Sequence, residues 1–163
     1  MQRLDFAAAA LVLAAALLGC SGGGEGGAPP VETIDFPSNY RTAYTLMKDC
    51  ATSGEHDLNN VRVYASSTAV GPFRTRSAPF PKGAVVIKEE HDIGDTNCAD
   101  DPIQWTVMKK LATGSSSEKL DWHWQLIDAS RHIVNEDAAR CWGCHALCGV
   151  EPDGFDGTCT MLQ

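Results

Sequence analysis

The chain has 163 residues, a formal net charge of −8 and seven cysteines. This length predicts a single domain. The acidity argues against a nucleic-acid partner, because phosphate backbones would repel the chain and it has no basic cluster longer than Lys109-Lys110.

The N-terminus has the pattern of an export signal. Residues 6–18 form an almost unbroken apolar run that is too short to span a bilayer, and Leu17-Leu18-Gly19-Cys20 closes it. That ending resembles the lipobox of bacterial lipoproteins, which implies that Cys20 becomes an acylated N-terminus. The alternative is an ordinary secretory signal with Cys20 as a free thiol. Either interpretation predicts export, and we expect a domain in the periplasm that is anchored to the envelope through lipid alone.

Three segments follow from this division. Residues 1–19 are the expected signal peptide, residues 20–35 a flexible tether rich in Gly, Pro and Ser, and residues 36–163 the folded domain. The domain should open with a helix capped by Ser38 and ended by Gly54. One face of that helix would carry residues at helical spacing, namely Tyr40, Ala43, Tyr44 and Met47.

The middle of the chain changes to the period of two that is typical of strands. Alternating or β-branched runs predict four strands near residues 61–65, 84–89, 103–111 and 121–127. Trp122 and Trp124 should share one face of the last strand. Loops are expected after Ala65, where Gly, Pro and Ser are frequent, and as an acidic segment at residues 92–102.

The C-terminal part carries the chemical signature. A short helix capped by Asn135 should present the pentapeptide Cys141-Trp142-Gly143-Cys144-His145. Two thiols three positions apart can each add to a porphyrin vinyl group, and the adjacent imidazole then becomes the proximal iron ligand. The pattern predicts one covalent haem c per chain. The alternative is a Cys141–Cys144 disulfide followed by a histidine that binds no haem.

Four cysteines remain after lipid and haem are assigned, and an even number suits an oxidising compartment. Their three pairings cannot be distinguished from the sequence, although we favour Cys148 with Cys159, which enclose a short loop, and Cys50 with Cys98. A zinc site made by Cys141, Cys144, Cys148 and Cys159 is the competing interpretation.

The predicted elements together define an α+β fold, a mainly antiparallel β-sheet flanked by an N-terminal helix and a C-terminal haem-attachment helix. In this order the chain resembles the cytochrome P-460 family, which includes the beta-type cytochromes c-prime. The resemblance spans about residues 36–145. Its parts are Pro37-Ser38-Asn39-Tyr40-Arg41, Val61-Arg62-Val63-Tyr64-Ala65, Phe80-Pro81-Lys82-Gly83-Ala84-Val85-Val86-Ile87-Lys88-Glu89, Asp121-Trp122 and the terminal haem motif.

The resemblance implies a commonly dimeric protein whose haem iron keeps an open position. In the enzymes of the family a lysine near the end of the strand that follows the Gly is joined covalently to the porphyrin, and here that lysine is Lys88. Those enzymes also place a carboxylate on the distal side as a proton acceptor, a position that falls on Thr106 in this sequence. The acceptor would then have to be Asp100, Asp101 or a water.

Two functions follow from the resemblance: oxidation of hydroxylamine with transfer of electrons to an external acceptor, or binding of nitric oxide without turnover. Chemistry alone adds a third, six-coordinate electron transfer. For that third function the candidate sixth ligands are the remaining histidines and three methionines, namely His56, His91, His123, His132, Met47, Met108 and Met161. Parity points His123 away from the tryptophan face. Arg62 is a candidate partner of a haem propionate, with a solvated strand face as its alternative.

Overall fold

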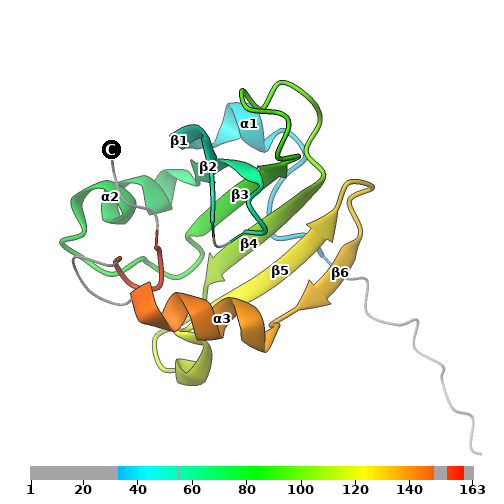
Figure 1. The fold of residues 1–163 in the computed structure, drawn as a ribbon. Helices are drawn as coiled ribbons and strands as arrows, with labels where there is room; N and C mark the ends of the chain where they lie inside the picture. Colours follow the sequence, from blue (N-terminus) through cyan, green and yellow to red (C-terminus); the bar gives the residue numbers. More distant parts are fainter. Residues whose placement is uncertain (1–32, 55, 149–153, 160–163) are drawn as a thin grey trace, which may run out of the picture. The chain divides into compact units, whose positions relative to one another are not determined.

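The computed structural model describes residues 33–54, 56–148 and 154–159. A six-stranded antiparallel sheet with strand order β1-β2-β3-β4-β5-β6 forms its centre, so that neighbours in sequence are neighbours in the sheet (Figure 1). The strands are β1 Thr45–Thr52, β2 Asn60–Ala65, β3 Val85–His91, β4 Gln104–Lys110, β5 Trp122–Asp128 and β6 Ile133–Glu136. The helices are α1 Tyr40–Ala43, α2 Ser67–Thr75 and α3 Ala139–His145, with 3₁₀ turns η1 Ser117–Lys119 and η2 Ala146–Cys148. The predicted α+β class is confirmed.

Each face of the sheet has its own apolar cluster, because successive side chains in a strand point to opposite sides. The cluster on one face holds ten buried side chains, among them Phe73 from α2 and, from the strands, Met108 and the two predicted tryptophans Trp122 and Trp124. Val86 from β3 also belongs to it, and Cys141 and Trp142 of α3 pack against it. The opposite face packs Phe36 and Tyr40, from the start of the domain, against Ile87 and its neighbours. We call the first the α3 face and the second the α1 face.

The predicted N-terminal helix is wrong over most of its length. Only Tyr40–Ala43 is helical, Asn39 rather than Ser38 is at the cap position, and β1 follows directly. Two register shifts interrupt the pairing of β1 with β2, so β1 lacks the clean alternation that marks a strand. Pairing with β2 and the disulfide at Cys50 outweigh the helical spacing of its side chains.

The loop expected after Ala65 instead contains the helix α2. Gly71 and Pro72 hid this helix from the sequence pattern, since both residues disfavour a helix interior. Tertiary packing stabilises it: Ala69 and Phe73 are buried in the cluster of the α3 face. The acidic segment 92–102 is irregular, as predicted.

The C-terminal helix begins later than expected. Residues Ile133–Glu136 form β6, so Asn135 belongs to a strand and caps nothing, and α3 begins at Ala139. Asp137 makes the turn between them, with a positive φ of 50°. Its carboxylate accepts from the Trp124 backbone N–H at 3.1 Å and its own N–H donates to the Trp124 carbonyl at 2.9 Å. These bonds fix the start of α3 to β5.

Two disulfides, Cys50–Cys98 and Cys148–Cys159, match the favoured pairings. Asp35, which the sequence assigned to the tether, is nearly buried and lies 2.6 Å from both Lys109 Nζ and His123 Nδ1. The signal peptide, Cys20 and most of the tether fall outside the described residues. Within the described part of the chain, no helix is long and apolar enough to cross a membrane.

Candidate functional site

The two cysteines of the pentapeptide are free thiols on α3. Three positions apart on a helix, they lie on neighbouring turns of one side. Cys141 packs against the cluster of the α3 face, while Cys144 is exposed. Burial is the main cause that raises the pKa of the Cys141 thiol, and the charge of Glu90 adds to it in the same direction. Cys141 is therefore a protonated thiol at neutral pH.

His145 ends the same helix and lies between Trp124 and the C-terminal tail. Its ring centroid is 4.8 Å from that of Trp124, and its Nδ1 donates to the Gly157 carbonyl at 2.5 Å. Burial lowers the pKa of His145 to about 4, against a raising effect of the Gly157 bond. The imidazole is therefore neutral at pH 7, and since Nδ1 carries its proton, Nε2 keeps the lone pair that a metal ion needs.

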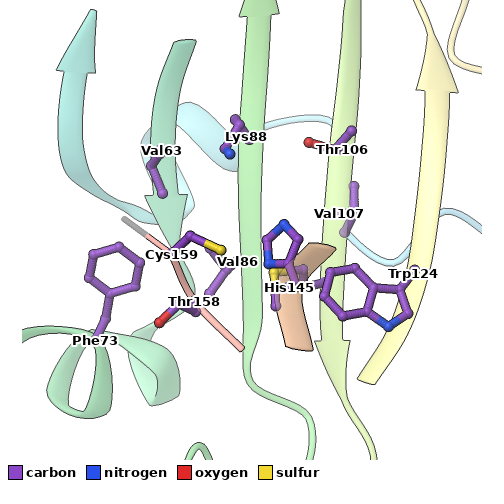
Figure 2. Close-up of a pocket in the computed structure, with 11 residues that line it drawn as sticks. Val63, Phe73, Val86, Lys88, Thr106, Val107, Trp124, His145, Thr158 and Cys159 are labelled. Carbon is purple, nitrogen blue, oxygen red and sulfur yellow. The ribbon is translucent and has the colours of Figure 1, made fainter. Parts of the chain in front are cut away.

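A pocket opens beside this imidazole on the α3 face of the sheet. Figure 2 shows His145 near its centre, with Phe73 and Thr158 toward one end and Lys88 and Thr106 toward the other. Most of the other lining residues are apolar: Val63, Val86, Val107, Met108, Trp124 and Cys159. The pocket thus joins a neutral nitrogen ligand, an apolar wall and a polar end.

A chain of hydrogen bonds leaves the pocket at Lys88. Its Nζ lies 2.7 Å from His56 Nε2, and His56 Nδ1 lies 3.0 Å from Glu90 Oε1. A lysine ammonium has only donors, so Nε2 accepts; the His56 proton is then on Nδ1 and is donated to Glu90. This is the geometry in which a carboxylate orients an imidazole and the imidazole faces an amine.

Glu90 is the carboxylate on which these bonds converge. Its Oε1 also accepts from the Thr106 hydroxyl at 3.0 Å, and its Oε2 from Gln104 at 2.7 Å and Asn59 at 3.3 Å. Burial would raise the pKa of Glu90, but the hydrogen bonds from His56, Gln104 and Asn59 outweigh it, so this pKa is lowered from its ordinary value of 4.5. Glu90 is an ionised, 1 % exposed carboxylate one hydrogen bond behind the pocket wall.

Sequence reasoning missed Glu90, and it named His56 only as a candidate sixth iron ligand and not as a partner of Lys88 and Glu90. Thr106 does line the pocket, whereas Asp100 and Asp101 are exposed in the loop 92–102 and absent from the pocket lining. The alternation of side chains along a strand could have identified Glu90, since a residue two positions after Lys88 lies on the same face. No local pattern marks His56, which the fold brings there from the segment between β1 and β2.

The remaining predicted candidates lie elsewhere. Arg62 lies opposite Glu89 in the register of β2 and β3. Its side chain donates to Asp49 and to the Cys98 and Asn97 carbonyls, so the structure does not bring Arg62 to the pocket. His91 is fully buried beside Glu89 and Asp95, and His132 is largely exposed. His123 faces Asp35 and Glu136, away from the tryptophans as parity predicted. Of the methionines, Met108 lines the pocket, Met47 packs near it, and Met161 is outside the described residues.

The zinc interpretation is wrong, because Cys148 and Cys159 are joined in a disulfide. Among the described residues no group of three or more His, Cys, Asp or Glu side chains could hold a metal ion by itself. Two free thiols on one side of a helix, followed by a neutral imidazole beside an apolar pocket, are instead the donor set that suits a haem. Fold and site together therefore define the class of a haem-binding α+β domain.

Comparison with known proteins agrees with this class. A family described as Cytochrome P460 matches residues 37–150, which include the whole sheet and α3. The chain belongs to the cytochrome P460 family and is a haem protein. No curated protein matches the sequence.

Proposed function

We propose that the chain is an exported c-type cytochrome that carries one haem on thioether bonds from Cys141 and Cys144, with His145 as the proximal ligand. The free thiols and the neutral imidazole, held by its Nδ1 bond to Gly157, support this arrangement. Among the described residues, His145 is the one histidine that lines the pocket, so we propose that no second histidine binds the iron.

The reaction that we propose is oxidation of hydroxylamine or a similar small nitrogen compound. Bound haem would supply a redox-active iron with an open position, from which electrons pass to an external acceptor. Such an oxidation also releases protons, and these need a base near the pocket. The observation that carries the proposal is the Glu90 network, which supplies an ionised carboxylate where Thr106 had suggested that none exists.

In this proposal each polar side chain has a defined task. The Thr106 hydroxyl faces the pocket and donates to Glu90, so its lone pair can receive a substrate proton while its own proton moves to the carboxylate. His56 holds Glu90 in place and links it to Lys88. The proton is thereby taken from the pocket into a buried network rather than into bulk water.

Lys88 has a second proposed role, the covalent link to the porphyrin that the family resemblance implies. Its place on the pocket wall supports this role, because Lys88 and Thr106 are cross-strand partners on the α3 face. Mass spectrometry of a tryptic digest tests it directly. A haem-bearing peptide that contains Lys88 is expected, and a Lys88 peptide of unmodified mass from the holoprotein would contradict the link.

Binding of nitric oxide without turnover is the second candidate function. The apolar wall of Val63, Phe73 and Val86 favours it, since such a wall suits a small uncharged gas. Met108, also in the lining, keeps the third function open, because a thioether bound to iron would close the site and leave electron transfer only. A low-spin ferric spectrum would identify that case.

Turnover of hydroxylamine with an artificial electron acceptor separates the candidates. For an oxidase, Glu90→Gln should lower the rate per haem about 100-fold. Asp101→Asn is the matched control, since it neutralises an exposed carboxylate on the neighbouring loop and should leave the rate unchanged. Equal rates for wild type and Glu90→Gln would refute the role of Glu90. A wild type that binds nitric oxide tightly and oxidises nothing would favour the second function.

We further propose that acylation of Cys20 anchors the domain to the envelope, with the domain in the periplasm. The lipobox-like ending Leu17-Leu18-Gly19-Cys20 supports it. Cys20→Ser should move the protein from the membrane fraction to the soluble fraction, and a variant that remains in the membrane fraction would contradict the anchor.

A further inference from the structure

The C-terminal tail, residues 154–159, is tied to the sheet by Asp156. The backbone carbonyl of Asp156 accepts from Trp122 Nε1 at 2.9 Å. Its carboxylate takes two more bonds, one from Lys110 Nζ at 2.7 Å and one from the Phe80 backbone N–H at 3.0 Å. One side chain therefore joins the tail to β4 and to the segment before β3.

Gly157 follows and faces the proximal imidazole. Its φ of +83° suits glycine, and a Cβ there would lie 3.1 Å from a Leu120 methyl and 3.4 Å from Trp122 Nε1. Its N–H donates to the Cys148 carbonyl at 3.2 Å, and its carbonyl accepts from His145 Nδ1 at 2.5 Å. The Cys148–Cys159 disulfide follows this contact in both segments, so it ties η2, directly after α3, to the tail beside it.

From this arrangement we propose that the tail, fixed by Asp156 and by the Cys148–Cys159 disulfide, is a positioning device that presents the Gly157 carbonyl to His145 and thereby tunes the iron. The proposal rests on the proposed role of His145 as proximal ligand. The tail lies beyond the residues 37–150 that match the family, so the family assignment says nothing of it.

The physical effect follows from the direction of the bond. A proximal imidazole that donates Nδ1–H to a carbonyl is a better electron donor through Nε2, and it is held in one tautomer and orientation. A stronger donor favours ferric over ferrous iron. Loss of the carbonyl should therefore weaken the iron–histidine bond and shift the equilibrium toward the ferrous form.

Asp156→Ala in the full-length holoprotein tests the device, because Asp156 neither contacts His145 nor lines the pocket. We expect the iron–histidine stretching frequency of the ferrous protein to fall. The ferric-to-ferrous preference should fall about tenfold, which is about 59 mV for one electron. Asp156→Asn, which can still accept one of the two bonds, should give a smaller shift. The double variant Cys148→Ser/Cys159→Ser should reproduce the direction.

Cys50→Ser/Cys98→Ser is the matched control. Its disulfide closes a separation of 48 residues against 11 for Cys148–Cys159, so its removal should cost more stability. It should leave the stretching frequency and the potential unchanged. If the tail had only a structural role, the stretching frequency and the potential would change in every variant in proportion to its loss of stability. That result would overturn the proposal.

Two further outcomes distinguish failure of the positioning role from failure of the proposed haem site. Haem-loaded wild type and Asp156→Ala with the same frequency and potential would overturn the positioning role while leaving the proposed haem site intact. A wild type that matures without haem would overturn the proposed haem site and, with it, the role of the tail.

Discussion

Two neighbouring glutamates on β3, Glu89 and Glu90, are both buried, yet they face opposite sides of the sheet and have different surroundings. Glu89 accepts from the Tyr40 hydroxyl and lies 2.5 Å from Arg41 Nε, and Tyr40 in turn accepts from Trp105 Nε1. All of these groups belong to the α1 face. Glu90 gathers His56, Thr106 and Gln104 on the α3 face, one hydrogen bond behind the pocket.

The difference shows that burial alone does not identify a carboxylate that lies next to a pocket. Glu89 closes a network whose members fasten the start of the domain to the sheet, and burial with the Glu89 contact raises the pKa of Tyr40 well above its ordinary value. Glu90 instead connects to two side chains, Lys88 and Thr106, that line a pocket. What separates the two is the face of the strand, which is set by the strand period of two.

The largest effect on stability is expected for Glu89→Gln. Removing the charge leaves Arg41 without its partner and disturbs the hydrogen bonds of a fully buried carboxylate, which should lower the free energy of unfolding by about 3 kcal/mol. Urea denaturation measures it. Activity per haem of the folded fraction should be unchanged, and a specific loss of turnover would mean that the α1 face takes part in the chemistry.

Glu90→Gln should cost less stability, about 1.5 kcal/mol, because an amide keeps some of the hydrogen bonds that a charged acceptor makes. Glu89→Gln should therefore have the larger effect on stability, and Glu90→Gln the larger effect on turnover. If Glu90→Gln destabilised the fold more than Glu89→Gln while leaving turnover intact, the functional assignment of the two faces would be reversed.

The loss of unfolding free energy in Glu90→Gln should depend on pH. Because the pKa of Glu90 is lowered on folding, the unfolded chain binds more protons below its ordinary value of 4.5. The stabilisation by Glu90 is then complete above about pH 4.5 and is lost as the pH falls toward the lowered pKa of the folded state. The difference in unfolding free energy between wild type and Glu90→Gln should shrink from pH 6 to pH 3. A constant difference would show that the charge of Glu90 is not stabilised by folding.

The smallest effect is expected for Arg62→Ala. Arg62 is on the α1 side of β2 and its partner Asp49 is largely exposed, so the loss should be about 0.5 kcal/mol. The absorption spectrum of the holoprotein should not change. A shifted Soret band in this variant would restore Arg62 as a partner of the haem.

The sequence predicted the parts of the fold in which local pattern and tertiary structure agree. Strands β2, β4 and β5 show the period of two, and β3 is a β-branched run. Both favoured disulfide pairs are present, although the sequence did not distinguish them from the other pairings. Strand β1 was missed because its bulged pairing breaks the alternation, and α2 because packing of Phe73 overrides Gly71 and Pro72.

The site divides in the same way. Cys141, Cys144 and His145 are recognisable because covalent attachment requires fixed spacing along the chain. His56 and Glu90 meet only in the folded sheet, 34 positions apart, and no short motif records that distance. The carbonyl of Gly157 is a backbone atom, so no residue type could have marked its bond to His145.

The most direct test of the central claim is the absorption spectrum of the purified holoprotein, matured in a host that attaches haem c and recorded in the ferric and ferrous states. We expect a covalently retained haem with a high-spin ferric spectrum, because the proposed site uses His145 as the one protein ligand of the iron. Protein recovered without haem, or a low-spin ferric spectrum from a second protein ligand such as Met108, would contradict it.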